Sequence, residues 1–139
     1  RFNPARLLPP GLTIDHVAVG GEVILLTVHS GALAAACPAC GEPSRRVQSH
    51  YIRRAADLPL GGRRVELQVS VRRFRCDAVG CKRQIFAERF AADVLPAFAR
   101  RTGRLERIVH HLALALGGRP GESLARRLML PMGRDTLLR

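Results

Sequence analysis

The chain has 139 residues, enough for one domain or two small ones, and its apolar content of 47% excludes an intrinsically disordered chain. Its 23 basic and 11 acidic residues leave a net charge of +12, which favours a polyanionic partner such as a nucleic acid. No apolar run approaches the roughly 18 residues of a membrane-spanning helix, so we expect no membrane partner.

The first predicted segment, residues 1–36, carries no net charge. It holds two basic and two acidic residues, opens with a proline-rich loop and contains a strand-like run at residues 22–29. His29 ends that run, where a lone histidine is more often structural than a metal ligand. The charge therefore lies on the next two segments, with twelve basic and five acidic residues at 37–90 (+7), and nine basic and four acidic residues at 91–139 (+5).

Four cysteines in two closely spaced pairs are the strongest chemical signal in the sequence. Cys37 and Cys40 lie in the run Cys-Pro-Ala-Cys-Gly, and Cys76 and Cys81 form the second pair. Each short turn can direct two thiolates at one metal ion, and two such turns supply the four soft ligands of tetrahedral zinc. The spacing predicts one structural zinc ion, because four thiolates leave no open position for catalysis.

Two other uses of the cysteines stay open at this level. They could form two disulfides in a secreted domain, although the chain shows no apolar leader. A Cys-x-x-Cys pair could also serve a thiol oxidoreductase, which would not need the second pair. The zinc prediction has one difficulty, because 35 residues separate Cys40 from Cys76, whereas compact ribbons use about 15 to 20. The intervening chain must therefore be structured.

The second predicted segment, residues 37–90, reads as a β-rich zinc-binding module. Strands are expected at 47–54, 64–73 and 85–89, with a glycine turn at 60–63. The strand at 64–73 alternates apolar and polar residues and predicts a half-buried antiparallel strand. The alternation slips at Arg73 and Phe74, which indicates a bulge or an exit from the sheet before Cys76. A hairpin in this insert would bring the two cysteine pairs together.

Arginine doublets recur through this module. Neighbouring residues of a strand point to opposite faces, so each doublet presents one arginine to any one ligand. We expect some of them to contact phosphate and others to form a solvated rim. The candidates for phosphate contact are Arg53, Arg54, Arg72 and Arg73.

The third predicted segment, residues 91–139, is helical. An apolar stripe at 105–116 predicts one helix, which Gly117 and Gly118 end. A second short helix starts near Pro120 and should turn Leu124, Ala125 and Leu128 inward, leaving Arg126 and Arg127 outside.

A third helix is predicted at 134–139, where the helical signal is still running as the sequence ends. Two short helices joined by a turn and preceded by a longer helix match the helix-turn-helix plan. The fold class expected is therefore α+β, a small β-rich zinc-binding module with four cysteine ligands, followed by an all-α helix-turn-helix segment.

These blocks together resemble the N-terminal region of bacterial insertion-sequence transposases of the ISL type. The resemblance runs over roughly residues 37–139, while residues 1–36 add little. Two departures stand at the turn of the helical part, where Met129 replaces a usual glycine and Gly133 a usual serine. The shared runs are the Cys-Pro-x-Cys-Gly finger, His50-Tyr51-Ile52-Arg53-Arg54 with Asp57-Leu58-Pro59, the strand leading to Cys76, the run from Cys81 to Arg89, and Asp135-Thr136-Leu137-Leu138-Arg139.

The resemblance implies sequence-specific binding of double-stranded DNA at the terminal inverted repeats of a mobile element, in the bacterial cytoplasm at the nucleoid. The catalytic carboxylate domain of such transposases has no counterpart in this sequence, so we expect no enzymatic activity, no catalytic residue and no small-molecule substrate. Self-association is left open. The base-reading candidates are Arg134, Thr136 and Arg139, and the phosphate-contact candidates of the helical part are Arg119, Arg126 and Arg127.

Three rival functions remain at the level of sequence. A stand-alone zinc-containing helix-turn-helix transcription regulator would need no downstream domain. A zinc ribbon could instead serve RNA or a protein partner, although five Phe, one Tyr and no Trp make an extended single-strand stacking platform a poor fit. The thiol oxidoreductase is the third, and stoichiometric zinc would exclude it.

Overall fold

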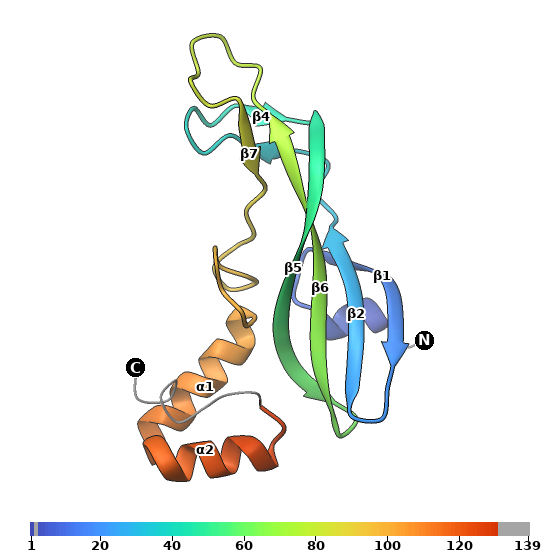
Figure 1. Cartoon of the computed structure of the whole chain (residues 1–139), viewed down its shortest axis with the longest axis vertical. Helices are drawn as coiled ribbons and strands as arrows, with labels where there is room; N and C mark the ends of the chain where they lie inside the picture. Colours follow the sequence, from blue (N-terminus) through green and yellow to red (C-terminus); the bar gives the residue numbers. More distant parts are fainter. Residues whose placement is uncertain (2, 131–139) are drawn as a thin grey trace.

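A computed structural model describes residue 1 and residues 3–130, and shows one long, twisted sheet with two helices at one end and the cysteine pairs at the other (Figure 1). No described helix combines the length and apolar character needed to cross a membrane. The elements in chain order are the 3-10 helix η1 (Pro4–Leu7), β1 (Leu12–Val19), β2 (Val23–Ser30), β3 (Ala35–Ala36), β4 (Pro43–Ser44), β5 (Val47–Leu60), β6 (Arg63–Arg75), β7 (Ile85–Ala87), α1 (Gly103–Leu116) and α2 (Gly118–Arg127).

The main sheet has the strand order β1-β2-β6-β5, with β7 paired to the far end of β6. It therefore joins strands from the first two predicted segments. Strand β6 is antiparallel to β5, as predicted for the hairpin, and also to β7, but it is parallel to β2, which no local pattern had indicated. The reason is topological. The chain leaves β2 at the cysteine end, enters β5 from that end, and returns through the hairpin alongside β2.

The hairpin of β5 and β6 confirms the predicted link between the cysteine pairs. Leu60 and Arg63 pair across a two-residue loop of Gly61 (φ 57°) and Gly62 (φ 73°). Positive φ at both positions is the requirement of a type I′ hairpin turn, which glycine meets without steric cost. Strand β5 runs on to Leu60, well past the predicted residue 54, although Pro59 is a poor strand former.

The core on one face of the sheet follows the predicted alternation in β6. Val65, Leu67, Val69 and Val71 are all buried, together with Leu8 before β1 and with Val94 and Leu95 after β7. Phe74 breaks this alternation and is buried in a separate cluster at the cysteine end. The pairing register shifts on β5 between Val47 and Ser49, opposite Phe74 and Arg73, which confirms an irregularity just before Cys76.

The two helices meet at Gly117, whose φ of 72° ends α1 as expected for glycine. Ala125 of α2 is fully buried with Leu105 and Val109 of α1, as predicted. The prediction that Leu124 and Leu128 face inward is wrong, since they are 37% and 47% exposed. The small side chain of Ala125 and the buried Gly121 make the contact with α1 instead.

Residues 128–130 close α2 with a Schellman motif. The Met129 N–H donates to the Arg126 carbonyl (3.2 Å), and the Leu130 N–H donates to the Ala125 carbonyl (2.9 Å). Met129 has φ 59°, the left-handed position that glycine prefers, and buried Leu130 packs in the same cluster as Ala125. The predicted third helix at 134–139 lies outside the described residues.

Candidate metal centre and nucleic-acid interface

The first cysteine pair is held by a tight turn between the two short strands β3 and β4. The Cys37 N–H donates to the Glu42 carbonyl (2.9 Å), and the Gly41 N–H donates to the Cys37 carbonyl (2.8 Å). Gly41 has φ 80°, so the chain can reverse here without steric cost. This turn directs both thiols of the pair to one side.

The second pair follows directly from the end of β6. The Cys76 N–H donates to the Gln84 carbonyl (2.9 Å), and the Cys81 N–H donates to the Ala78 carbonyl (3.2 Å). Strand β7 then pairs with β6, so the loop from residue 76 to residue 84 is closed at both ends. The antiparallel hairpin therefore delivers the second pair of thiols opposite the first.

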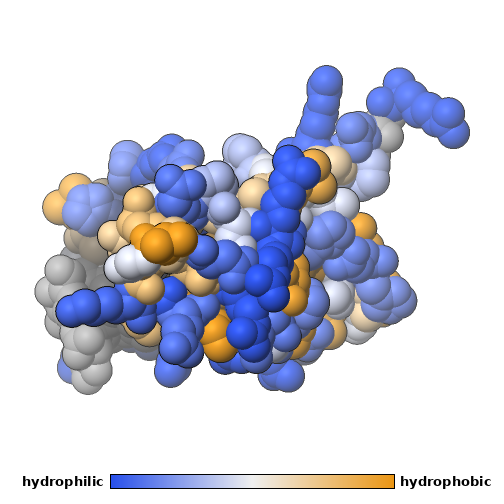
Figure 2. All heavy atoms as spheres, turned by 90° about the horizontal axis from the view of Figure 1, so that it is seen from above, coloured by the Kyte–Doolittle hydropathy of each residue, from blue (hydrophilic) through white to orange (hydrophobic). Residues whose placement is uncertain are grey.

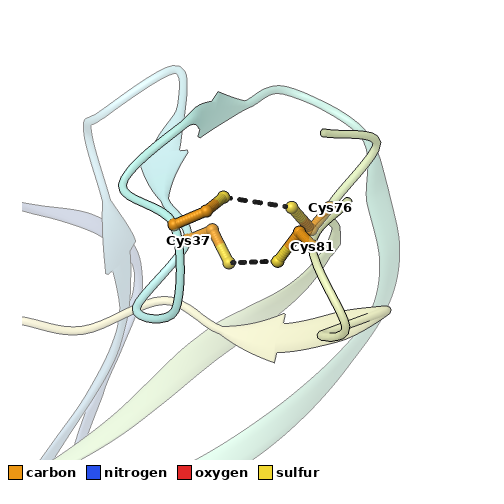
Figure 3. Close-up of side chains that lie close together, drawn as sticks. Cys37, Cys76 and Cys81 are labelled. Carbon is orange, nitrogen blue, oxygen red and sulfur yellow. Dashed lines mark hydrogen bonds between the residues drawn. The ribbon is translucent and has the colours of Figure 1, made fainter. Parts of the chain in front are cut away.

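The four sulfur atoms come together in one cluster. The Sγ atoms of Cys37 and Cys81 are 3.9 Å apart, those of Cys40 and Cys76 are 3.6 Å apart, and all four lie within 4.8 Å of one another (Figure 3). A disulfide would need about 2.05 Å between sulfurs, so these are four free thiols. The disulfide alternative does not fit this geometry.

This geometry matches a tetrahedral zinc site. A Zn–S bond of about 2.3 Å places thiolates on a tetrahedron with edges of about 3.8 Å, which the two measured sulfur separations bracket. The thiolates also need local stabilisation. Burial raises the pKa of Cys37, but N–H donors of Cys40 and Ala39 and the nearby thiols lower it to about 7.

The pKa values of the Cys40 and Cys76 thiols are raised in the absence of a metal. The N–H donor of Ala78 lowers the pKa of Cys76, but burial and the neighbouring thiols together outweigh it and raise that pKa to about 12. A thiolate in the cluster therefore makes ionisation of a neighbouring thiol less favourable, and a bound divalent cation offsets that electrostatic cost. The donor set fits one structural zinc ion, as predicted.

Aromatic side chains support the metal site from one side. Phe74 and Phe86, paired across β6 and β7, stack at 5.8 Å between ring centroids and are buried with Cys37. The irregular position of Phe74 thus has a structural purpose, because it places an apolar ring under the metal site rather than in the main core.

The fold and the thiol cluster define a protein with a β-rich zinc-binding module. Residues 34–81 match a family model described as the zinc-finger of transposase IS204/IS1001/IS1096/IS1165, which covers about a third of the chain. No curated protein and no solved structure matches the chain. The match supports a transposase zinc-finger region, a non-catalytic part that points to DNA binding, and it does not extend to the helices.

Hydrophilic side chains cover much of the zinc end, whereas α2, which carries three of the predicted arginine contacts, lies at the other end of the molecule (Figure 1). Figure 2 looks at the molecule from the zinc end and shows long hydrophilic side chains projecting over most of the face. Among the predicted contacts, Arg54 and Arg73 are exposed, and the Arg73 guanidinium lies 4.5 Å above the Tyr51 ring. Arg119 and Arg127 are exposed on α2, where Arg126 lies 3.3 Å from Glu122.

Two further predicted contact residues have protein partners. Arg53 Nη2 donates to the carbonyl oxygens of Pro96 and Ala99, both at 2.9 Å. Arg72 Nη2 lies 2.8 Å from the buried Glu88 carboxylate, which also accepts the Arg72 backbone N–H. In these two doublets, Arg53 and Arg72 are the inward arginines, whereas Arg54 and Arg73 are exposed. The base-reading candidates Arg134, Thr136 and Arg139 lie outside the described residues.

Sequence reasoning missed the junction between the sheet and the helices. The buried Asp57 carboxylate of β5 accepts from Thr102 Oγ1 (2.7 Å) and from Arg104 Nε (2.8 Å) at the start of α1. Arg104 also donates to the Leu7 carbonyl, which ties in η1. The only sequence signal was the run Asp57-Leu58-Pro59 within the family resemblance.

Proposed function

We propose that this chain binds double-stranded DNA sequence-specifically, at the terminal inverted repeats of a mobile element, as the N-terminal part of a transposase. The observation that carries the proposal is the transposase zinc-finger match over residues 34–81, together with four thiols that lie within 4.8 Å of one another. The net charge of +12 supports a polyanionic partner.

In this proposal the zinc ion and the arginines have different roles. The zinc ion ties the two cysteine pairs together and has no open position for water or substrate, so it contributes folding free energy rather than chemistry. The outward arginines contact phosphates, while Arg53 and Arg72 support the surface through their protein partners. The phosphate contacts are Arg54, Arg73, Arg119, Arg126 and Arg127.

The helices carry the sequence reading in this proposal. We assign residues 91–139 as the helix-turn-helix segment, with Arg134, Thr136 and Arg139 on the helix that enters the major groove. Support comes from α1 and α2, which pack together as the first helices of the helix-turn-helix plan would, and from the Schellman motif that closes α2. Arginine paired to guanine is the commonest specific contact of such helices.

Selection of bound sequences from random duplex DNA, at a stated salt concentration, tests the proposal. We expect enrichment of one motif, and an affinity that falls steeply as salt rises. If no duplex sequence is enriched, end recognition fails. A motif found in a promoter rather than at element ends would favour the stand-alone regulator.

A charge-removing pair of variants tests the phosphate contacts. Each phosphate contact contributes about 0.9 to the slope of log affinity against log salt, so Arg127→Ala should lower that slope by about 0.9. The matched control is Arg6→Ala in the electrically neutral first segment, which should leave the slope unchanged. If the two variants have equal salt slopes, α2 does not belong to the DNA interface.

A further inference from the structure

Phe98 combines an exposed ring with a left-handed backbone conformation, and neither feature stabilises the folded chain. Its side chain is 97% exposed, and its backbone has φ 62°, in the left-handed region. The Ala99 N–H donates to the Pro96 carbonyl (3.1 Å), so Phe98 is the third residue of a turn whose third position normally takes glycine or asparagine. The chain thus bears backbone strain at a residue whose ring gains no burial.

The turn that displays Phe98 is held rigidly. Arg53 of β5 donates from the same Nη2 atom to the carbonyls of Pro96 and Ala99, the two ends of the turn. Leu95 before the turn is buried in the main core, and Ala99 packs against that core. The Phe98 ring is therefore presented by a fixed frame rather than by a loose loop.

A hollow of about 400 Å³ lies beside Phe98, between the Cys37 turn, β5, β7 and the turn itself. This volume is within the range of small-ligand sites and accommodates one nucleotide. Tyr51 and Phe90 add aromatic surface, and the exposed Arg83 and Arg89 add positive charge.

The charge that this hollow offers to a ligand is positive. Glu88 is its one acidic lining residue among the described residues, and that carboxylate is already paired with Arg72 at 2.8 Å. An exposed aromatic ring that lines one hollow with two exposed guanidinium groups suits a ligand with a flat face and nearby negative charges. Nucleobases with their phosphates have that combination, whereas an apolar protein surface does not.

We infer that Phe98 stacks on an unpaired nucleobase, with Arg83 and Arg89 on the flanking phosphates; the inference rests on the proposed DNA-binding function. Inside a duplex both faces of a base are covered by its neighbours, so a ring on a turn reaches a face only where stacking is interrupted. A forked or distorted end of a DNA element offers such a base.

The test compares two DNA probes of equal length, a fully paired blunt duplex and a duplex with a short unpaired arm at one end. The wild-type chain should bind the forked probe more tightly. Phe98→Ala should remove that preference, by about one to two orders of magnitude in affinity for the forked probe, with little change for the blunt probe. Phe98→Trp should retain it, because any flat aromatic ring can stack.

Two controls complete the design. Leu33→Ala removes another exposed apolar side chain and should leave both affinities unchanged. The double variant Arg83→Ala/Arg89→Ala should lower the salt slope for the forked probe by about 1.4, because each phosphate contact on a single strand contributes about 0.7. Zinc content and melting temperature verify that each variant is folded.

The outcomes distinguish failure of the proposed function from failure of the inference about Phe98. If the wild-type chain binds neither probe, the proposed function itself fails. If it binds the blunt duplex with a steep salt dependence but shows no preference for the fork, or if Phe98→Ala keeps that preference, only the inference about Phe98 is overturned. Loss of self-association in Phe98→Ala, with DNA affinities intact, would overturn it too and reassign the ring to a protein contact.

Discussion

Removing the charge of Asp57 should detach the helical pair from the sheet. Its carboxylate is 2% exposed and receives three hydrogen bonds, one from Thr102 and two from Arg104, across 45 and 47 residues of chain. Removing one partner of a buried ion pair costs about 3–5 kcal/mol, and the Arg104 side chain, 31% exposed, can recover part of its hydration. We therefore expect about 3 kcal/mol for Asp57→Ala and about 2 kcal/mol for Asp57→Asn, which keeps the Thr102 hydrogen bond.

The assay is urea unfolding of the zinc-loaded chain, with the melting temperature as a second measure. For a chain of this size, about 3 kcal/mol corresponds to a lowering of roughly 10 °C. The matched control is Asp77→Asn, which removes a similarly short but exposed ion pair to Arg46 (2.7 Å) and should cost under about 1 kcal/mol. If Asp57→Asn and Asp77→Asn have the same small effect, the junction is not held by this buried pair.

The metal centre and the backbone give three more predictions. Removal of zinc by a chelator, or Cys76→Ser, should abolish the cooperative thermal transition of the zinc end, measured by calorimetry, because the four thiols then have no common partner; an unchanged transition would refute the structural role. Gly103→Ala should destabilise the fold by about 1–3 kcal/mol in urea, since a Cβ there would overlap the Asp93 carbonyl group, whereas Gly21→Ala, which meets open space, should change little. Met129→Gly should stabilise the chain by about 0.5–1 kcal/mol, because glycine adopts the left-handed position without steric cost; a loss of stability on thermal melting would contradict the Schellman assignment.

Local pattern in the sequence determined the elements closest to the metal. The spacing of Cys37, Cys40, Cys76 and Cys81 predicted one zinc ion, and the thiol cluster agrees. The alternation of β6 and the glycine pair at 61 and 62 predicted the hairpin that closes the long gap. These features depend on residues within a few positions of one another, where φ preferences and side-chain periodicity act directly.

Pairing between distant residues was decided only in the tertiary structure. No periodicity or spacing in the sequence indicated that β2 lies parallel to β6, that Arg53 holds the turn of Phe98, or which residues the Asp57 carboxylate would bind. The two arginines of a doublet look alike in sequence, and their division into inward and outward residues depends on which carboxylate or carbonyl the fold brings near. Whether a charged or aromatic side chain is structural or available to a ligand is therefore fixed by neighbours that are distant along the chain, and no local pattern encodes them.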